Sequence, residues 1–131
     1  MMTAPLLAPE MSAHLVTTCR GTIGDSLRSV TYFTRDDYER LYLRDDLEWD
    51  ADLSTFVGHE WREFKLTQDS YVESELGSYR YTIRVFENGF LVRVASERDG
   101  VLVTTDGLTL KDFEELATAV RSVLENEERT R

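Results

Sequence analysis

Apolar residues in the first half of the chain repeat at helical spacing and then gather in two short runs. The helical stripe consists of Leu15, Val16, Cys19, Ile23 and Leu27. Ser12 precedes this stripe and is its predicted N-cap. The runs at 27–33 and 38–44 are joined by a short polar segment, which favours a β-hairpin. The second run also fits a short helix, so its assignment as a strand depends on that hairpin.

The second half of the chain gives a clearer pattern of one helix, three strands and a final helix. Apolar residues recur at helical spacing over 53–66. Three strands are predicted, at 79–87, 90–97 and 101–105. Thr109 and Asp112 have the spacing of a capping box at the start of the last helix. The predicted buried stripe of that helix consists of Leu110, Phe113, Leu116, Val120 and Leu124.

Asn88 and Gly89 form the strongest turn signal in the chain. Pairing across a two-residue turn at these positions places Arg84 opposite Arg93 on one face of the hairpin. Two facing arginines need an anion between them, and Glu60 lies in the middle of the apolar stripe of helix 53–66. We therefore predict a partly buried ion cluster of Glu60, Arg84 and Arg93. A site for an anionic ligand and simple solvent exposure are the alternatives.

The predicted elements follow the order helix, two strands, helix, three strands, helix. This order and the place of the hairpin at 88–89 resemble the roadblock (dynein light chain-type) domain. The resemblance implies an α+β fold, α-β-β-α-β-β-β-α, with a five-stranded antiparallel sheet and helices on both faces. Profilin-like and PAS-like sheets are close alternatives. We expect a single domain over 12–125, a flexible leader at 1–11 and a charged tail at 126–131.

Roadblock domains commonly dimerise through their third strand and second helix, and serve as adaptors or regulators of small GTPases. The resemblance therefore implies a homodimer and a protein partner such as a small GTPase or a regulator. The exposed edge of strand 79–87 is the predicted seam, because a second strand would satisfy its unpaired backbone groups. Its predicted residues are Tyr79, Tyr81, Ile83 and Val85. The predicted interface residues of helix 53–66 are Phe56, Trp61 and Phe64.

The charge balance indicates the environment in which the protein works and limits the classes of partner that it can bind. The chain carries 25 acidic against 15 basic residues, a net charge of −10, and only Lys65 and Lys111 among the cations are lysine. This excess argues against binding to nucleic acid or to anionic membranes, both of which need clustered cations. The acidic, lysine-poor composition resembles small proteins of halophilic archaea, whose function is unassigned. Since concentrated salt screens such a charge, we predict a cytoplasmic protein that works at high salt.

Candidate chemistry is sparse in this sequence. Cys19 is the single cysteine and fits a buried thiol, while His14 and His59 lie far apart without zinc-binding spacing. The acidic run 45–52 lacks the glycine and terminal glutamate of a calcium loop. No catalytic, metal or cofactor residue is predicted. The pattern favours a non-enzymatic, homodimerising adaptor or regulatory protein over a small-ligand sensor of PAS or profilin type, and over a small enzyme.

Overall fold

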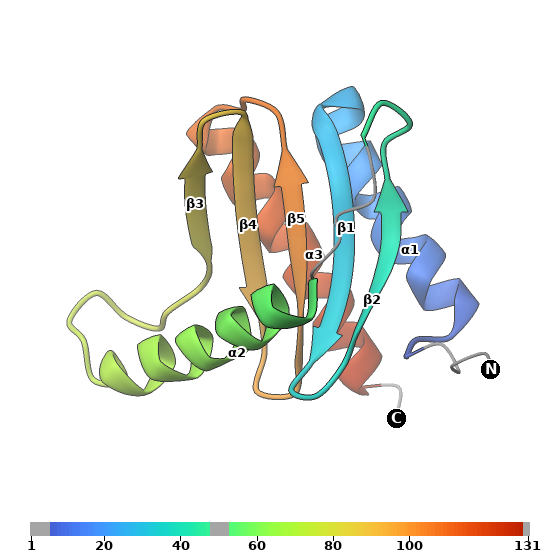
Figure 1. Cartoon of the computed structure of the whole chain (residues 1–131). Coiled ribbons are helices and arrows are strands. Elements are labelled where there is room, and N and C mark those ends of the chain that lie inside the picture. Colours follow the sequence, from blue (N-terminus) through green and yellow to red (C-terminus); the bar gives the residue numbers. More distant parts are fainter. Residues whose placement is uncertain (1–5, 48–52, 130–131) are drawn as a thin grey trace.

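The computed structural model describes residues 6–47 and 53–129 of the chain. The helices are α1 (Pro9–Ile23), α2 (Leu53–Ser70) and α3 (Leu110–Arg129), with a short 3₁₀ turn, η1, at Gly24–Ser26. The strands are β1 (Leu27–Thr34), β2 (Tyr38–Leu43), β3 (Thr82–Phe86), β4 (Gly89–Ala95) and β5 (Asp99–Thr105). The predicted α+β element order is confirmed, including a strand rather than a helix in the 38–44 run (Figure 1).

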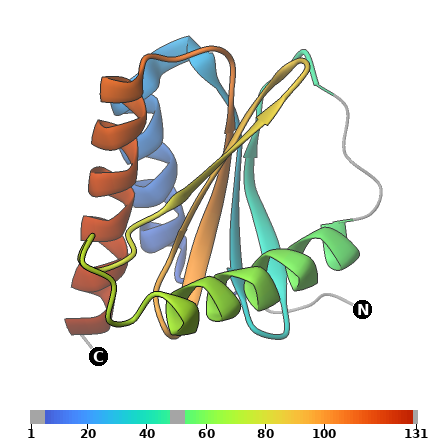
Figure 2. The same cartoon turned by 90° about the vertical axis from the view of Figure 1, so that its left-hand side faces the viewer.

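The five strands form one antiparallel sheet in the order β2-β1-β5-β4-β3. The first and last strands along the chain, β1 and β5, therefore pair at its centre, and β2 and β3 are its edges. Helices α1 and α3 lie side by side on one face, and α2 crosses the other (Figures 1 and 2). This arrangement buries both faces of the sheet while leaving the outer side of β3 without a strand neighbour in the described chain.

The larger core lies between the sheet and the pair α1 and α3. Its fully or almost fully buried side chains include Leu15, Cys19, Val30, Val92, Val103 and Leu116. Each large apolar side chain among them contributes roughly 1.5–3 kcal/mol through the removal of apolar surface from water. Burial also raises the pKa of the Cys19 thiol to about 12, so this group is protonated near neutral pH and unsuited to act as a nucleophile.

The smaller core lies between the sheet and α2. Its buried members are Phe33, Val57, Phe64, Leu91, Ala95 and Leu102. The indole of Trp61 stands edge-on to Phe33, with ring centroids 6.1 Å apart, and also contacts Phe64 at 5.9 Å. Gly100 lets this packing form, because a Cβ there would lie only 2.5 Å from the Phe33 ring. The packing of α2 on the sheet thus depends on a few large side chains.

The register of the β3–β4 hairpin differs from the prediction by two residues. Phe86 pairs with Gly89 and Thr82 with Arg93, so the turn residues are Glu87 and Asn88. The predicted pairing of Arg84 with Arg93 is wrong: Arg84 faces Leu91. Gly89 belongs to β4 because its backbone lies against β5, where a Cβ would come within 2.7 Å of the Thr105 carbonyl oxygen. Glycine is needed here for close approach rather than for a left-handed turn.

Strand β3 is also shorter than the predicted run 79–87. Continuing the observed register would place Arg80 opposite Ala95. Instead, Arg121 of α3 reaches this point. Its Nη2 donates to the backbone carbonyl oxygen of Arg80 at 3.0 Å and to that of Ala95 at 3.1 Å. The guanidinium satisfies groups that a longer ladder would have paired. Residues 79–81 therefore leave the sheet.

The start of α1 differs from the prediction, whereas the cap of α3 agrees with it. The N-cap of α1 is Ala8 and not Ser12, because Pro9 occupies the first turn, where its fixed φ and missing N–H suit the helix start. Leu7 is consequently part of the core at 4% exposure, although it falls in the predicted leader 1–11. Thr109 and Asp112 form the predicted reciprocal cap of α3. Leu110 is 74% exposed rather than buried, since first-turn side chains tilt past the helix end.

Candidate functional site

A buried ion pair lies at the centre of the contact between α2 and the sheet. Glu60 projects from the middle of α2 and Arg93 from the middle of β4, with exposures of 1% and 0%. Arg93 Nη1 donates to Glu60 Oε1 at 2.9 Å and to the Glu60 carbonyl oxygen at 3.1 Å. Taking both charges out of water is expensive, so the pair is stable only with further partners.

Those partners come from α2, from β3 and from the segment before β3. Arg84 Nε donates to Glu60 Oε2 at 2.8 Å, and Arg93 Nη1 donates to Glu63 Oε1 at 2.7 Å. Arg93 Nη2 donates to the hydroxyls of Tyr79 and Thr82, at 2.6 and 2.9 Å. Within the described chain, Nε is the one nitrogen of the Arg93 side chain that lacks an acceptor. The result is a cluster in which nearly every polar group is satisfied.

The electrostatics of this cluster favour the charged forms of Glu63 and Arg93. The hydrogen bond from Arg93 holds the pKa of the Glu63 carboxyl below its usual range. For Arg93, burial lowers the pKa, but its bonds to Tyr79 and Glu63 outweigh burial and the net pKa is raised. The guanidinium also lies over the Phe64 ring, 5.8 Å from its centroid. Glu63 and Arg93 therefore both remain ionised around neutral pH.

The structure brings Glu60, Arg84 and Arg93 together, as the ion-cluster interpretation requires. The two-residue error in register leaves this grouping intact, because a shift of two keeps every side chain on its face of the sheet. Glu63 and Tyr79 were not expected in the cluster. Glu63 follows Glu60 by three positions and so lies on the same face of α2, which is a signal that the sequence offers. Tyr79 gives no such signal.

The predicted dimer-edge residues divide between the core and the surface. Tyr79 points to Arg93 below α2, and Tyr81 donates from its hydroxyl to Glu114 of α3 at 2.6 Å. Ile83 packs against the larger core. Val85 is 73% exposed, and its neighbour Phe86, which is not among the predicted edge residues, is 53% exposed. The accessible apolar surface of β3 therefore lies at its C-terminal end.

The predicted interface residues of α2 lie differently. Phe64 is buried against the sheet and closed to a partner, and Trp61 is half-buried beside it. The side chain of Phe56 lies outside the described part of the chain. The exposed apolar side chains occur later, at the C-terminal end of α2 and in the segment that follows: Leu66, Tyr71, Val72 and Leu76. Figure 1 shows this end of α2 reaching past β3 at the edge of the sheet.

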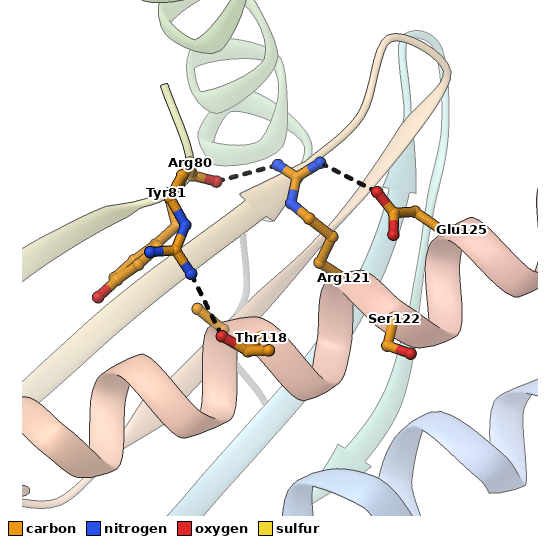
Figure 3. Close-up of a pocket in the computed structure, with 7 residues that line it drawn as sticks. Arg80, Tyr81, Thr118, Arg121, Ser122 and Glu125 are labelled. Carbon is orange, nitrogen blue, oxygen red and sulfur yellow. Dashed lines mark hydrogen bonds and ion pairs between the residues drawn. The ribbon is translucent and has the colours of Figure 1, made fainter. Parts of the chain in front are cut away.

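A shallow cavity of about 160 Å³ lies where α3 passes the segment before β3 (Figure 3). Arg80 enters it from the sheet side, and Arg121 and Glu125 enter it from α3. These side chains are already engaged, since Arg80 pairs with Glu114 at 2.6 Å and Arg121 binds backbone carbonyls. The hydrogen bond from Tyr81 lowers the pKa of Glu114. The cavity is best explained as the place where residues 79–81 are fastened to α3.

A second ion network joins the start of β1, the end of β2 and the turn after β5. Asp106 accepts from Arg44 Nη1 at 2.7 Å and from Arg28 Nη1 at 3.1 Å. Arg44 also donates to Asp46 at 2.6 Å and to the Asp25 carbonyl oxygen. The hydrogen bond from Arg44 is the main cause that holds the pKa of Asp106 below its usual value. This network holds together the start of β1, the end of β2 and the turn after β5, at the end of the sheet that lies away from α2.

The lowered pKa of Asp106 predicts a pH-dependent contribution to stability. Above the pKa of an unfolded Asp, about 3.9, the ionised group favours the folded state, and this contribution disappears as the pH falls through the lower folded-state pKa. We expect Asp106→Asn to be less stable than the parent near neutral pH, by about 1 kcal/mol at this half-exposed site. Urea unfolding across the acid range should show the difference shrinking below about pH 4. A difference that stays constant into strong acid contradicts this assignment.

No group of three or more His, Cys, Asp or Glu side chains within 6–47 and 53–129 is placed to hold a metal ion. No helix in the same described ranges is both long and apolar enough to cross a membrane.

Comparison with known proteins identifies the family. Residues 13–125 match the family described as a domain of unknown function, DUF7522. The chain belongs to this family. No curated protein matches it by sequence.

Solved structures extend the comparison beyond the DUF7522 family. The gliding protein MglB from Thermus thermophilus is 13% identical with a TM-score of 0.66, over 96% of this chain and 99% of that one. A roadblock/LC7 domain from Streptomyces avermitilis is 12% identical with a TM-score of 0.55, over 85% of this chain and 95% of that one. At these identities the likeness concerns the fold. The roadblock-like fold predicted from the element order is thus confirmed.

Proposed function

We propose that this DUF7522 protein is a non-enzymatic regulatory or adaptor protein that acts as a homodimer. The observation that carries the proposal is the edge strand β3, which has β4 on one side and no strand on the other within the described chain. Exposed Val85 and Phe86 lie on this strand, and the apolar end of α2 reaches past it. A second copy placed against β3 would satisfy its backbone groups and cover this apolar surface.

The roadblock resemblance supports a further protein partner for the dimer, and a small GTPase or its regulator is the class that it implies. The acidic composition supports a cytoplasm rich in salt, because a net charge of −10 on each copy opposes association until ions screen it. Dimerisation and a salt-rich setting are therefore connected. Two strongly acidic copies associate through an edge strand that carries Arg84 and apolar residues rather than the acidic excess.

Sedimentation of the full chain tests this function. In molar KCl, at tens of micromolar protein, we expect a dimer whose dissociation constant rises when the salt is lowered, because self-repulsion then extends over about 10 Å or more. A chain that remains monomeric in molar KCl contradicts the homodimer. A dimer that is equally tight or tighter at low salt supports dimerisation but contradicts the salt-rich setting. Addition of GTPase candidates to the dimer then tests the partner class.

A further inference from the structure

Arg84 belongs to two parts of the molecule at once. Its backbone lies in the edge strand β3, and its guanidinium lies below α2 with Glu60, at 2.8 Å and 3.3 Å to the two carboxylate oxygens. The same guanidinium approaches Glu63 Oε1 at 3.2 Å. With 28% of its side chain exposed, Arg84 lies on the proposed seam and reaches the buried Arg93 through their shared partner Glu60.

The charges of the cluster balance. Arg84 and Arg93 face Glu60 and Glu63, so two positive groups meet two negative ones. Arg93 and Glu60 are already out of water, whereas Arg84 and Glu63 keep 28% and 35% of their side chains exposed. Covering the β3 edge would reduce the contact of these two groups with water. A cluster of zero net charge can lose this water at little cost in free energy, because attraction between its opposite charges grows as the local dielectric falls. A cluster with an unpaired charge loses the hydration of that charge without compensation, which costs free energy.

We propose that this four-charge cluster couples dimerisation at β3 to the docking of α2 on the sheet. The inference rests on the homodimer proposed above and describes the regulation of that same site. Pairing at β3 strengthens the Arg84–Glu60 contact and so holds α2 more firmly. By reciprocity, anything that lifts α2 removes carboxylates from Arg84 and weakens the dimer by the same factor. A partner that displaces α2 from the sheet thereby weakens the dimer.

Three variants of the full chain test the role of charge balance. Arg84→Met leaves the cluster with one excess negative charge, and Glu63→Gln leaves it with one excess positive charge. We expect each to raise the dimer dissociation constant about tenfold or more in sedimentation, since an uncompensated charge is then covered at the seam. The double variant restores neutrality and should return to within about threefold of the parent, which additive losses of contact would not produce.

The Arg80–Glu114 pair provides the matched control. It joins the segment before β3 to α3 instead of α2, at 2.6 Å, and about half of each side chain is exposed. Arg80→Met and Glu114→Gln change the net charge of the chain as the test variants do. Because this pair is directed to α3, both variants should leave the dimer dissociation constant within about threefold of the parent. If Arg80→Met and Arg84→Met weaken the dimer equally, net charge rather than cluster balance is responsible.

Hydrogen exchange of α2 gives the second measurement and separates the two proposals. In the parent, protection of α2 amides should rise with protein concentration as the dimer forms, and in Arg84→Met this rise should be lost even where enough protein is added to restore the dimer. A parent chain that never dimerises overturns the proposed function itself. A dimeric parent whose variants all keep its affinity and its α2 protection overturns only the coupling.

Discussion

Replacement of Glu60 with Ala is expected to lower the free energy of unfolding by about 3–5 kcal/mol. The substitution removes the carboxylate that both Arg84 and Arg93 contact, and Arg93 has no exposed surface through which water could replace it. Glu63 remains, but its carboxylate approaches Arg93 from the half-exposed side of α2. A buried guanidinium then retains only one ionic partner. Denaturant unfolding in molar KCl measures the loss without a contribution from long-range surface repulsion.

Two further variants test whether the loss of stability comes from leaving Arg93 unpaired or from removing a carboxylate as such. Glu115 is exposed on α3, and Glu115→Ala should change stability by no more than about 0.5 kcal/mol. The double variant Glu60→Ala/Arg93→Met removes the unpaired charge as well, and we expect it to be more stable than Glu60→Ala alone. If Glu60→Ala unfolds at the same denaturant concentration as the parent, water solvates Arg93 in solution and the buried cluster is contradicted.

The grouping of Glu60 with Arg84 and Arg93 could be predicted, although the hairpin register could not. The alternation of side chains along a strand has a period of two, so an error of two residues in register preserves both faces. An error of one would have separated the arginines. The error itself arose at Gly89, which resembles a turn glycine in the sequence but lies in β4 against the Thr105 carbonyl. That close approach depends on β5, which local sequence does not reveal.

The end of β3 illustrates a second limit of sequence reasoning. Tyr79 and Tyr81 alternate with Arg80 and Thr82 as a strand would, and this pattern predicted a longer edge. Arg121, about forty positions later in the chain, takes the carbonyl groups that would have extended the ladder. Released from the sheet, Tyr79 turns its hydroxyl to Arg93. Contacts of such separation decide the boundary, and no local propensity encodes them.

The predominance of arginine over lysine has a structural use at these contacts. Arg84 spans both oxygens of Glu60, and Arg44 divides its nitrogens among Asp46, Asp106 and a backbone carbonyl. A planar group with several fixed donors can bridge in this way, whereas an ammonium acts as a point charge. The arginine-rich composition thus also supplies the groups that join α2 to β3 and the end of β2 to the turn after β5. Both contacts depend on the same residue type.

The double substitution Val85→Lys/Phe86→Lys is expected to raise the dimer dissociation constant by about 100-fold or more. Side chains alternate along β3, so Val85 shares the face of Ile83, which packs against the larger core. Phe86 shares the face of Arg84, which contacts α2, and the two exposed side chains therefore flank the edge. In a twofold dimer each substitution counts twice, which places four lysines at the seam. Lysine on an edge strand opposes pairing because its ammonium must stay hydrated.

Long-range repulsion between copies cannot cause this loss of dimer affinity. The parent chain carries a net charge of −10, and two added lysines make it less negative and so reduce that repulsion. The matched control is Ala13→Lys/Thr17→Lys, which adds the same charges to exposed positions of α1, far from β3 at the opposite side of the sheet (Figure 1). It should bind as the parent does or slightly tighter. Sedimentation in molar KCl compares the three proteins. A Val85→Lys/Phe86→Lys variant that dimerises as the control does would place the contact between copies away from β3, and the partner-binding surface would then have to be sought on another edge or helix.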